Sequence, residues 1–406
     1  MELLAPAGGP EQLRLATHFG ADAVYLAGKR WGMRARSDNF TDDELARAVT
    51  WAHGRGVSVH VTLNVVMTDE DMDALPAYLR FLDEIGADAA IVADLGVLDL
   101  MQRYAPHVEA HLSTQASVMS ATTADAWARL GVRRIVLARE LSLDQIAELR
   151  RRCSKELELE AFAHGSLCMA YSGRCLLSAE LMGANRSPSK GACAQPCRWA
   201  WHLVEEKSGA EVPLEQDERG SYLLSSNDLC MIGHLDALAE AGVDAIKVEG
   251  RAKGSYYTAC VTNAYRHVLD GSPVAPWRAE LDAVSHRPYS TGFYFGAATQ
   301  NPGRVEYARE RMMLALVESC SVDSFGASVV EVTCRNRAHR DAEVKVLSPG
   351  EDVRRLRLAN LEERDEASGT WTAVDTMARS MGRYRFRSRF PLSKRDVICL
   401  EGGQEG

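Results

Sequence analysis

The stretch GVDAIKVEGR at residues 242–251 contains the pattern that decides the fold of this 406-residue chain. A glycine of the kind that ends a helix comes first, a short apolar run follows, and polar residues end the pattern. The same pattern occurs in GADAVYLAG (20–28), GADAAIVADLG (86–96) and GVRRIVLARE (131–140). Each copy predicts the end of a helix followed by a buried β-strand.

Four further apolar runs bring the total to eight: ELLAPAG (2–8), VSVHVTLN (57–64), EAHLSTQ (109–115) and LELEAFAHG (157–165). Helix signals lie between most of the runs, and the capping-box spacing occurs at Thr41–Glu44 and Ser142–Gln145. Eight alternating strand and helix units in roughly 250 residues predict an α/β fold, a TIM-like (β/α)8 barrel. A doubly wound open sheet is the alternative, but no early G-x-G-x-x-G turn supports it.

The regular alternation breaks after the seventh run. We predict a barrel domain over residues 1–275, with an insertion at 166–230 that carries cysteines and a β-hairpin. Residues 286–406 are predicted to form a small C-terminal β-barrel-like domain. An insertion after a barrel strand lies at the C-terminal face, where barrel enzymes place their chemistry.

The composition predicts a soluble, cytoplasmic protein. Apolar residues make up 46% of the chain and charged residues 25%, and neither a membrane span nor a signal peptide can be recognised. The ten cysteines are therefore expected to be thiols rather than structural disulfides. The net charge of −9 is uneven, because residues 286–406 carry 19 Lys and Arg against 17 Asp and Glu. A nucleic-acid partner is thus expected to contact the C-terminal part.

Polar side chains follow most of the predicted strands. In a barrel these positions meet at one mouth and form a polar pocket, although some of the side chains can simply pair with one another. The residues at these positions are Tyr25, Asn64, Asp94, Thr114, Gln115, Arg139, Glu140, His164, Lys247, Glu249 and Arg251.

Half of the cysteines fall within the 63 residues that begin at Cys168: Cys168, Cys175, Cys193, Cys197 and Cys230. The paired C-x2-C knuckles of a zinc ribbon are absent, and a C-x3-C-x2-C cluster motif fails because Ala200 occupies the third position. A single cysteine nucleophile with His164 as its base would not explain five thiols. From spacing alone, an iron–sulfur cluster, a tetrahedral zinc site and unliganded thiols all remain open.

The chain resembles the collagenase-like peptidase family of unknown catalytic type. The resemblance rests on EAFAHGSLCMAYSGRCLLS (160–178), GACAQPCRW (191–199), NDLC (227–230) and IKVEGRAKGSYY (246–257), and on the phrases ELLAPAG, VTLN, LSTQ and VLARELSL nearer the N-terminus. It spans roughly residues 1–270. The sequence departs from the family where MGANRSPSKGAC (182–193) replaces a shorter loop before the third cysteine.

The resemblance implies a function as well as a fold. Members with understood roles are oxygen-independent RNA hydroxylation proteins, and the stretch HRPYSTGFYFG (286–296) resembles the branch that acts on tRNA. That branch implies prephenate-dependent hydroxylation at C5 of the wobble uridine, with the tRNA anticodon arm, a small dianionic metabolite and an accessory redox protein as partners. The alternatives are a collagenase-like peptidase and a zinc-stapled binding protein. The sequence contains neither H-E-x-x-H nor G-x-S-x-G, so no motif for proteolysis is visible.

The resemblance also implies which residues form the site. A [4Fe-4S] cluster would be held by Cys168, Cys175, Cys193 and Cys230, with Cys197 as an alternative ligand. The pocket beside it would be lined by Arg139, His164, Tyr171, Lys247, Glu249 and Arg251. A small dianion such as prephenate would need the cationic members of this set.

The C-terminal stretch GRYRFRSRFPL (382–392) has a period of two. On a strand, Arg383, Arg385, Arg387 and Arg389 would line one face, while the aromatic residues between them fill a small core. Such a face can contact RNA phosphates and unpaired bases. The alternative is a solvated face whose arginines pair with the acidic stretch EERDE (362–366).

Overall fold

The computed structural model describes residues 1–32, 38–168, 175, 177–187, 191–196, 199, 202–204, 211–213, 227–296 and 311–401. The chain forms two compact units. The first unit comprises residues 1–17, 21–253 and 286–307, and the second comprises 18–20, 254–285 and 308–406. No helix in the described ranges has both the length and the apolar character that crossing a membrane requires.

The first unit is built around a closed barrel of parallel strands, as predicted. Its strands are β1 (Glu2–Pro6), β2 (Ala23–Leu26), β3 (Ser58–Leu63), β4 (Ala89–Val92), β5 (Glu109–Leu112), β6 (Val132–Val136), β7 (Glu158–Ser166) and β11 (Ala245–Val248). Neighbours in this order pair in parallel, β11 also pairs with β1, and the pairing of β11 with β7 closes the ring. Seven of the eight predicted runs contain one of these strands completely, and β7 extends one residue beyond the remaining run.

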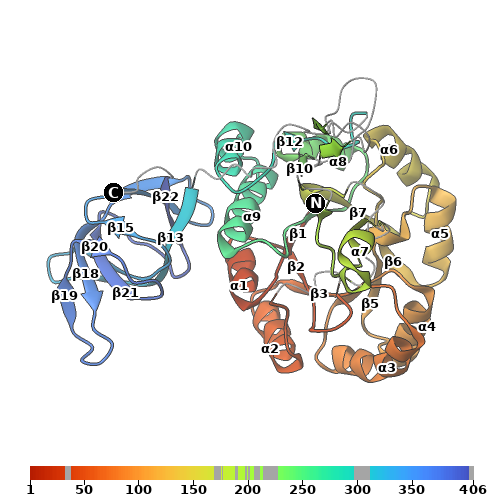
Figure 1. The fold of residues 1–406 in the computed structure, drawn as a ribbon, viewed down its shortest axis with the longest axis horizontal. Coiled ribbons are helices and arrows are strands. Elements are labelled where there is room, and N and C mark those ends of the chain that lie inside the picture. Colours follow the sequence, from red (N-terminus) through yellow and green to blue (C-terminus); the bar gives the residue numbers. More distant parts are fainter. Residues whose placement is uncertain are drawn as a thin grey trace. The chain divides into compact units, whose positions relative to one another are not determined.

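Helices connect the strands, and α2 to α6 surround the barrel (Figure 1). The helices are α1 (Pro10–His18), α2 (Asp42–His53), α3 (Asp69–Glu84), α4 (Leu95–Tyr104), α5 (Ala121–Arg129), α6 (Leu143–Arg152) and α8 (Leu235–Glu240). Both predicted capping boxes form, at Thr41 before α2 and at Ser142 before α6. The cap side chain accepts a hydrogen bond from a free backbone N–H, which fixes where each helix begins.

The insertion begins after β7, and its last strand returns to the barrel beside the end of β7. The end of β7 pairs antiparallel with β10 (Asp228–Cys230), so that Cys230 lies opposite His164. Within the insertion, α7 (Leu177–Met182) is a short helix, and β8 (His202–Val204) and β9 (Glu211–Pro213) form the predicted hairpin. The seventh strand is therefore the element from which the cysteine segment is positioned.

Two glycines at the ends of strand runs, Gly8 and Gly165, allow the backbone after β11 to pass close to them at the barrel mouth. A Cβ atom on Gly8 would lie 2.0 Å from the carbonyl oxygen of Arg251. A Cβ atom on Gly165 would lie 2.4 Å from the carbonyl oxygen of Glu249, and Gly165 also has a φ of +102°. Larger residues at these positions would displace the segment that carries Glu249 and Arg251.

A buried ion pair fixes β10 to the segment that follows the barrel. The Arg287 guanidinium donates to Asp228 Oδ1 at 2.8 Å, and the Arg287 backbone N–H donates to Asp228 Oδ2 at 3.1 Å. Both side chains are almost fully buried, at 1% and 4% exposure. The same segment contains β12 (Tyr289–Ser290), which pairs in parallel with β10.

The second unit combines α9 (Ser255–Leu269) and α10 (Val274–Asp282) with a curled antiparallel sheet. The strand order is β17-β16-β22-β13-β14-β21-β18-β19. These strands are β13 (Arg311–Val322), β14 (Ser328–Cys334), β16 (Glu343–Leu347), β17 (Arg354–Arg357), β18 (Ala359–Arg364), β19 (Trp371–Ala373), β21 (Arg383–Ser388) and β22 (Val397–Glu401), and β15 (Ala338–His339) pairs separately with β20 (Thr376–Met377). Tyr384 and Phe386 lie in its core, which confirms the predicted small β domain.

Replacing Arg287 with methionine is expected to lower the free energy of unfolding of the barrel unit by about 3–5 kcal/mol, because the buried Asp228 carboxylate loses its partner. Urea unfolding followed by circular dichroism measures this change. Arg103→Met is the control, because its pair with Asp99 is exposed and is expected to contribute about 0.5 kcal/mol or less. Equal effects of the two substitutions on the free energy of unfolding would contradict the stabilising role of the buried Arg287–Asp228 pair.

Candidate functional site

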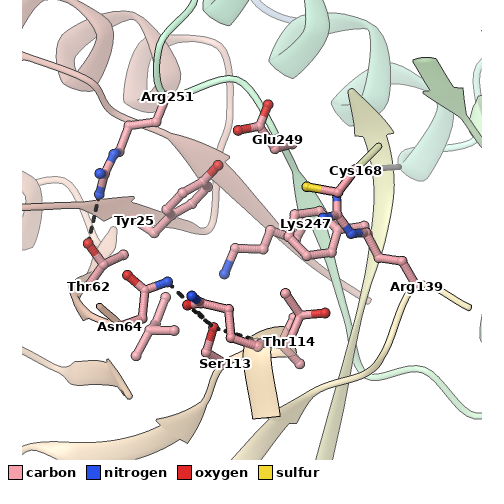
Figure 2. Close-up of a pocket in the computed structure, with 14 residues that line it drawn as sticks. Tyr25, Thr62, Asn64, Ser113, Thr114, Arg139, Cys168, Lys247, Glu249 and Arg251 are labelled. Atoms are coloured by element: carbon pink, nitrogen blue, oxygen red, sulfur yellow. Dashed lines mark hydrogen bonds between the residues drawn. The ribbon is translucent and has the colours of Figure 1, made fainter. Parts of the chain in front are cut away.

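A pocket opens at the C-terminal ends of the barrel strands, and fourteen residues line it (Figure 2). Of the polar strand-end residues singled out in the sequence, eight line this pocket: Tyr25, Asn64, Thr114, Gln115, Arg139, Lys247, Glu249 and Arg251. Asp94 instead caps α4 by accepting a hydrogen bond from the Gly96 N–H at 2.7 Å. The prediction of a polar pocket at the mouth is therefore confirmed.

Two arginines contribute positive charge from opposite sides of the pocket (Figure 2). Arg251 Nη1 donates to Thr62 Oγ1 at 2.7 Å. Arg139 Nη1 donates to the Ser166 carbonyl oxygen at 3.0 Å, and its guanidinium lies 5.0 Å from the centre of the Phe162 ring. Each arginine is thus held in place by a hydrogen bond to a strand other than the one that it follows, which reduces the entropy lost when it binds an anion.

The floor of the pocket holds a third cation, Lys247. Its side chain is buried, and its Nζ atom donates to Glu160 Oε1 at 2.9 Å. The ammonium also lies 4.5 Å from the centre of the Tyr25 ring. Burial lowers the pKa of Lys247, while the Glu160 carboxylate acts in the opposite direction.

Neutral hydrogen-bonding groups line the side of the pocket formed by β3 and β5. Asn64 Nδ2 donates to Ser113 Oγ at 3.5 Å, and the Ser113 hydroxyl donates to Gln115 Oε1 at 3.2 Å. The Thr114 hydroxyl donates to the Leu137 carbonyl oxygen at 3.0 Å. This side can recognise a polar group without adding charge.

Below the pocket, the barrel interior contains a group of buried titratable residues. Among the residues that the structure describes, only His60, His111 and Glu160 bring three possible metal-ligand atoms within 4.8 Å of one another. However, the two Glu160 oxygens already accept hydrogen bonds from Lys247 at 2.9 Å and Arg134 at 3.3 Å. A divalent ion would have to share this carboxylate with two fixed cations, so the group is better described as a buried charge network.

Two of the cysteines proposed as cluster ligands lie at the end of β7: Cys168 follows the strand, and Cys230 pairs with it on β10. Cys168 is exposed and lines the pocket, whereas Cys230 is buried on β10. Cys175 and Cys193 are half-buried in the insertion, and Cys193 Sγ accepts a hydrogen bond from the Gln195 N–H at 3.3 Å. Cys197 and Tyr171 lie outside the described residues.

The described cysteines offer an all-thiolate donor set, which suits an iron–sulfur cluster or a zinc ion, and the two groups differ in the sulfur spacing that they require. With a Zn–S bond of about 2.3 Å, tetrahedral zinc would hold its sulfur ligands about 3.8 Å apart. Within the described ranges, no three cysteines satisfy even a 4.8 Å limit. In a four-iron cluster each thiolate binds a different iron, so the sulfurs stand farther apart, and an all-thiolate donor set suits that cluster.

His164 lies close to the pocket without lining it. Its side chain is buried, and its ring lies 5.3 Å from the ring of Tyr289. His164 is adjacent to Cys230 across the β7–β10 pairing. The structure therefore places it between the barrel and the cysteine segment.

The arginines of the C-terminal stretch alternate with buried residues, as the period of two predicts, but carboxylates accompany them. Arg383 pairs with Glu331 at 3.4 Å, Arg385 pairs with Glu362, and Arg387 pairs with Asp323 at 2.9 Å. Arg389 is exposed just beyond β21. The Arg385–Glu362 pair is the expected alternative, in which the arginines pair with the acidic stretch 362–366. The positive charge of this strand face is therefore partly balanced.

Sequence reasoning missed six lining residues and the charges beneath them. The six are Thr62, Ile91, Ser113, Val136, Phe162 and, as a lining residue, Cys168. Thr62 lies two residues before Asn64 and Glu160 lies four before His164, so both share a strand face with a residue that was singled out. The signal that would have identified Glu160 is a second glutamate in the run LELEAFAHG, placed further inside the predicted buried strand than Glu158.

Comparison with known proteins gives a consistent result. Residues 8–303 match a family model described as peptidase family U32. The "tRNA hydroxylation protein P1" of Bacillus subtilis (strain 168) is 39% identical over 303 residues, which cover 73% of this chain and 71% of that protein. The "tRNA hydroxylation protein P" of Escherichia coli (strain K12) is 33% identical over 337 residues, covering 72% and 74%. A "Collagenase" of Porphyromonas gingivalis (strain ATCC BAA-308 / W83) is 33% identical over 313 residues, covering 73% of each.

The buried His60 ring predicts a pH-dependent stability. Its pKa lies well below the ordinary value, first because of burial and then because of His111, Arg134 and Lys247. An unfolded histidine titrates at about pH 6.5, so below that pH the unfolded chain binds one more proton than the folded chain. The free energy of unfolding therefore decreases by about 1.4 kcal/mol for each pH unit by which the pH is lowered. His60→Leu is expected to remove this contribution. Urea unfolding at pH 7.5 and 5.5 tests it, and an unchanged pH dependence in the variant would disprove it.

Proposed function

Because the chain belongs to peptidase family U32 and resembles relatives named as tRNA hydroxylation proteins, we propose that it is an RNA-modifying enzyme that hydroxylates tRNA. The specific reaction is oxygen-independent hydroxylation at C5 of the wobble uridine, with prephenate as co-substrate and a [4Fe-4S] cluster as cofactor. The observation that carries the proposal is that Cys168, a proposed cluster ligand, lines the same pocket as Arg139, Lys247 and Arg251.

The pocket suits a small dianion. Its three cations come from three sides, and carboxylates bind guanidinium and ammonium groups through charge-assisted hydrogen bonds. The lining also includes Phe162, Ile91 and Val136, which can pack against a non-ionic ring or chain. Prephenate combines two carboxylates with a non-ionic cyclohexadienol ring, so it matches both features.

The same mouth can admit a nucleobase. The wobble position lies in a single-stranded loop, so its base can leave the stack without breaking a base pair. Asn64, Ser113 and Gln115 offer donors and acceptors that can bind the polar edge of uracil. The proposed arginine face of β21 would contact the anticodon arm, with Arg389 and Arg387 as its most exposed members.

Hydroxylation at C5 replaces a C–H bond with a C–O bond, which is a two-electron oxidation. An oxygen-independent reaction therefore needs a co-substrate or redox partner that accepts electrons and a source of the hydroxyl other than O2. When bound, the cluster would supply electron-transfer chemistry, and Cys168, Cys175, Cys193 and Cys230 would hold it beside the pocket. Arg139, Lys247 and Arg251 would bind and orient the anionic co-substrate.

A peptidase function finds less support. Cys168 is the thiol in the pocket lining, but His164, the base nearest to it in sequence, does not line the pocket. Nucleophilic catalysis needs the base within hydrogen-bond reach of the nucleophile. The name of the collagenase relative is therefore the main point in favour of this alternative.

Purification without oxygen is expected to yield a brown protein with broad absorbance near ~400 nm and about four irons per chain. Cys193→Ser is expected to lower the iron content strongly, and comparison with Cys197→Ser identifies which of the two binds. Cys153→Ser is the control, because Cys153 is buried next to the end of α6. A colourless protein with one zinc ion per chain would disprove the cluster.

Deletion of the gene is expected to remove 5-hydroxyuridine derivatives from tRNA, as measured by mass spectrometry of tRNA nucleosides. Expression of the Arg251→Met variant is expected to restore less than about a tenth of the wild-type level, because a charge-assisted contact to the ligand is lost. The Arg103→Met variant should restore it fully, since Arg103 lies on the exposed surface of α4. Unchanged nucleosides in a deletion strain without a redundant enzyme would refute the activity.

A further inference from the structure

The ammonium of Lys247 is held at a fixed place in the pocket floor. Lys247 lies on β11, next to Phe162 of β7 in the strand register. Its Nζ atom is 4.5 Å from the Tyr25 ring and 5.8 Å from the Phe162 ring. An ammonium has three N–H groups, and the hydrogen bond to Glu160 uses one of them. The remaining donors can serve a ligand in the pocket.

Glu160 is the carboxylate that compensates this buried charge. Its side chain has 0% exposure, so both of its oxygens depend on protein donors. Oε1 accepts from Lys247 at 2.9 Å, and Oε2 accepts from Arg134 Nη1 at 3.3 Å. Arg134 is held in turn by Glu2 at 2.6 Å and Glu158 at 2.7 Å, at the opposite end of the barrel interior.

We propose that Glu160 is a positioning residue for the anion site: it keeps the Lys247 ammonium charged and fixed at the pocket floor, where Lys247 binds an acidic group of the ligand. The inference rests on the proposed function, because it takes the pocket's ligand to be an organic dianion. Glu160 itself does not line the pocket, so it acts only through Lys247.

The surrounding charges explain why Glu160 is needed. The groups around the Lys247–Glu160 pair are Arg134 on β6, Arg251 after β11, Tyr25 on β2, His60 on β3 and His111 on β5. Burial, Arg134 and Arg251 all favour the neutral amine of Lys247, whereas Glu160 favours the ammonium. Without the Glu160 charge, Lys247 would face two guanidiniums and lose its proton at a lower pH.

The test is prephenate binding to the full-length, cluster-loaded protein, measured by calorimetry between pH 6 and pH 9. Glu160→Gln keeps the shape of the side chain but removes its charge. We expect this variant to bind prephenate at least about tenfold more weakly at pH 7.5, with the pH midpoint of binding shifted downward. Glu158→Gln is the matched control, because Glu158 lies on the same strand and also bonds Arg134 but has no hydrogen bond to Lys247. It should change affinity by less than about twofold.

A double variant separates positioning from general damage. If Glu160 acts through Lys247, Glu160→Gln should cause no further loss of affinity in a Lys247→Met background. A further loss in that background, or equal losses from Glu160→Gln and Glu158→Gln, would overturn the inference. If Glu160→Gln does not fold, Glu160→Asp replaces it. This variant is expected to bind prephenate more weakly with an unchanged pH midpoint, because its carboxylate keeps the charge but lies farther from Lys247.

A second readout distinguishes this inference from the proposed function. If the wild-type protein binds no prephenate, the proposed co-substrate is wrong. The inference is then decided by NMR of protein labelled at lysine Cε, with the Lys247 signal assigned from Lys247→Arg. A lower titration midpoint in Glu160→Gln than in the wild type supports the positioning role, and an unchanged midpoint overturns it.

Discussion

The parallel pairing of β7 with β11 is the interaction on which the rest of the structure depends. It closes the barrel, and it places the Glu249 N–H within 2.8 Å of the His164 carbonyl oxygen. β11 contributes Lys247 to the pocket floor, and the chain beyond it contributes Glu249 and Arg251 to the walls, because residues two apart along an extended chain face the same side. Without this closure the strand ends would form a row rather than a ring, and the three cations would not converge.

The interior of the barrel is unusually charged for a core. Many barrels fill this space with branched apolar side chains, whereas here Arg134, Glu160 and Lys247 occupy it together with His60 and His111. Buried charges are tolerated when each has a partner, and Glu160 has one on either side. A charged interior is thus compatible with a stable barrel, because the charges of Arg134, Glu160 and Lys247 alternate in sign along it.

The sequence predicts the barrel well because its signals are local. A glycine before an apolar run and a capping box at a helix start depend on neighbouring residues, and all eight strands and both boxes are found. Polar strand ends predict the pocket for the same reason, since closure of a barrel brings them together without further information. Glu160 and Arg134 were missed, because a charged residue inside a strand gains its meaning only from partners on other strands. The balance of Arg385 by Glu362 is likewise a matter of sheet register, and Tyr171 and Cys197 lie outside the described residues.

The position of the insertion also affects how the chain can fold. β1 to β7 follow one another closely and can pair in the order of synthesis, but residues 167–244 separate β7 from β11. Closing so long a connection carries an entropic penalty and makes the last pairing the least local in the barrel. Until residue 248 has been made, β1 and β7 remain open edges that can pair with other chains. The cysteine segment lies within this connection, so anything that compacts it shortens the effective loop and favours completion of the barrel.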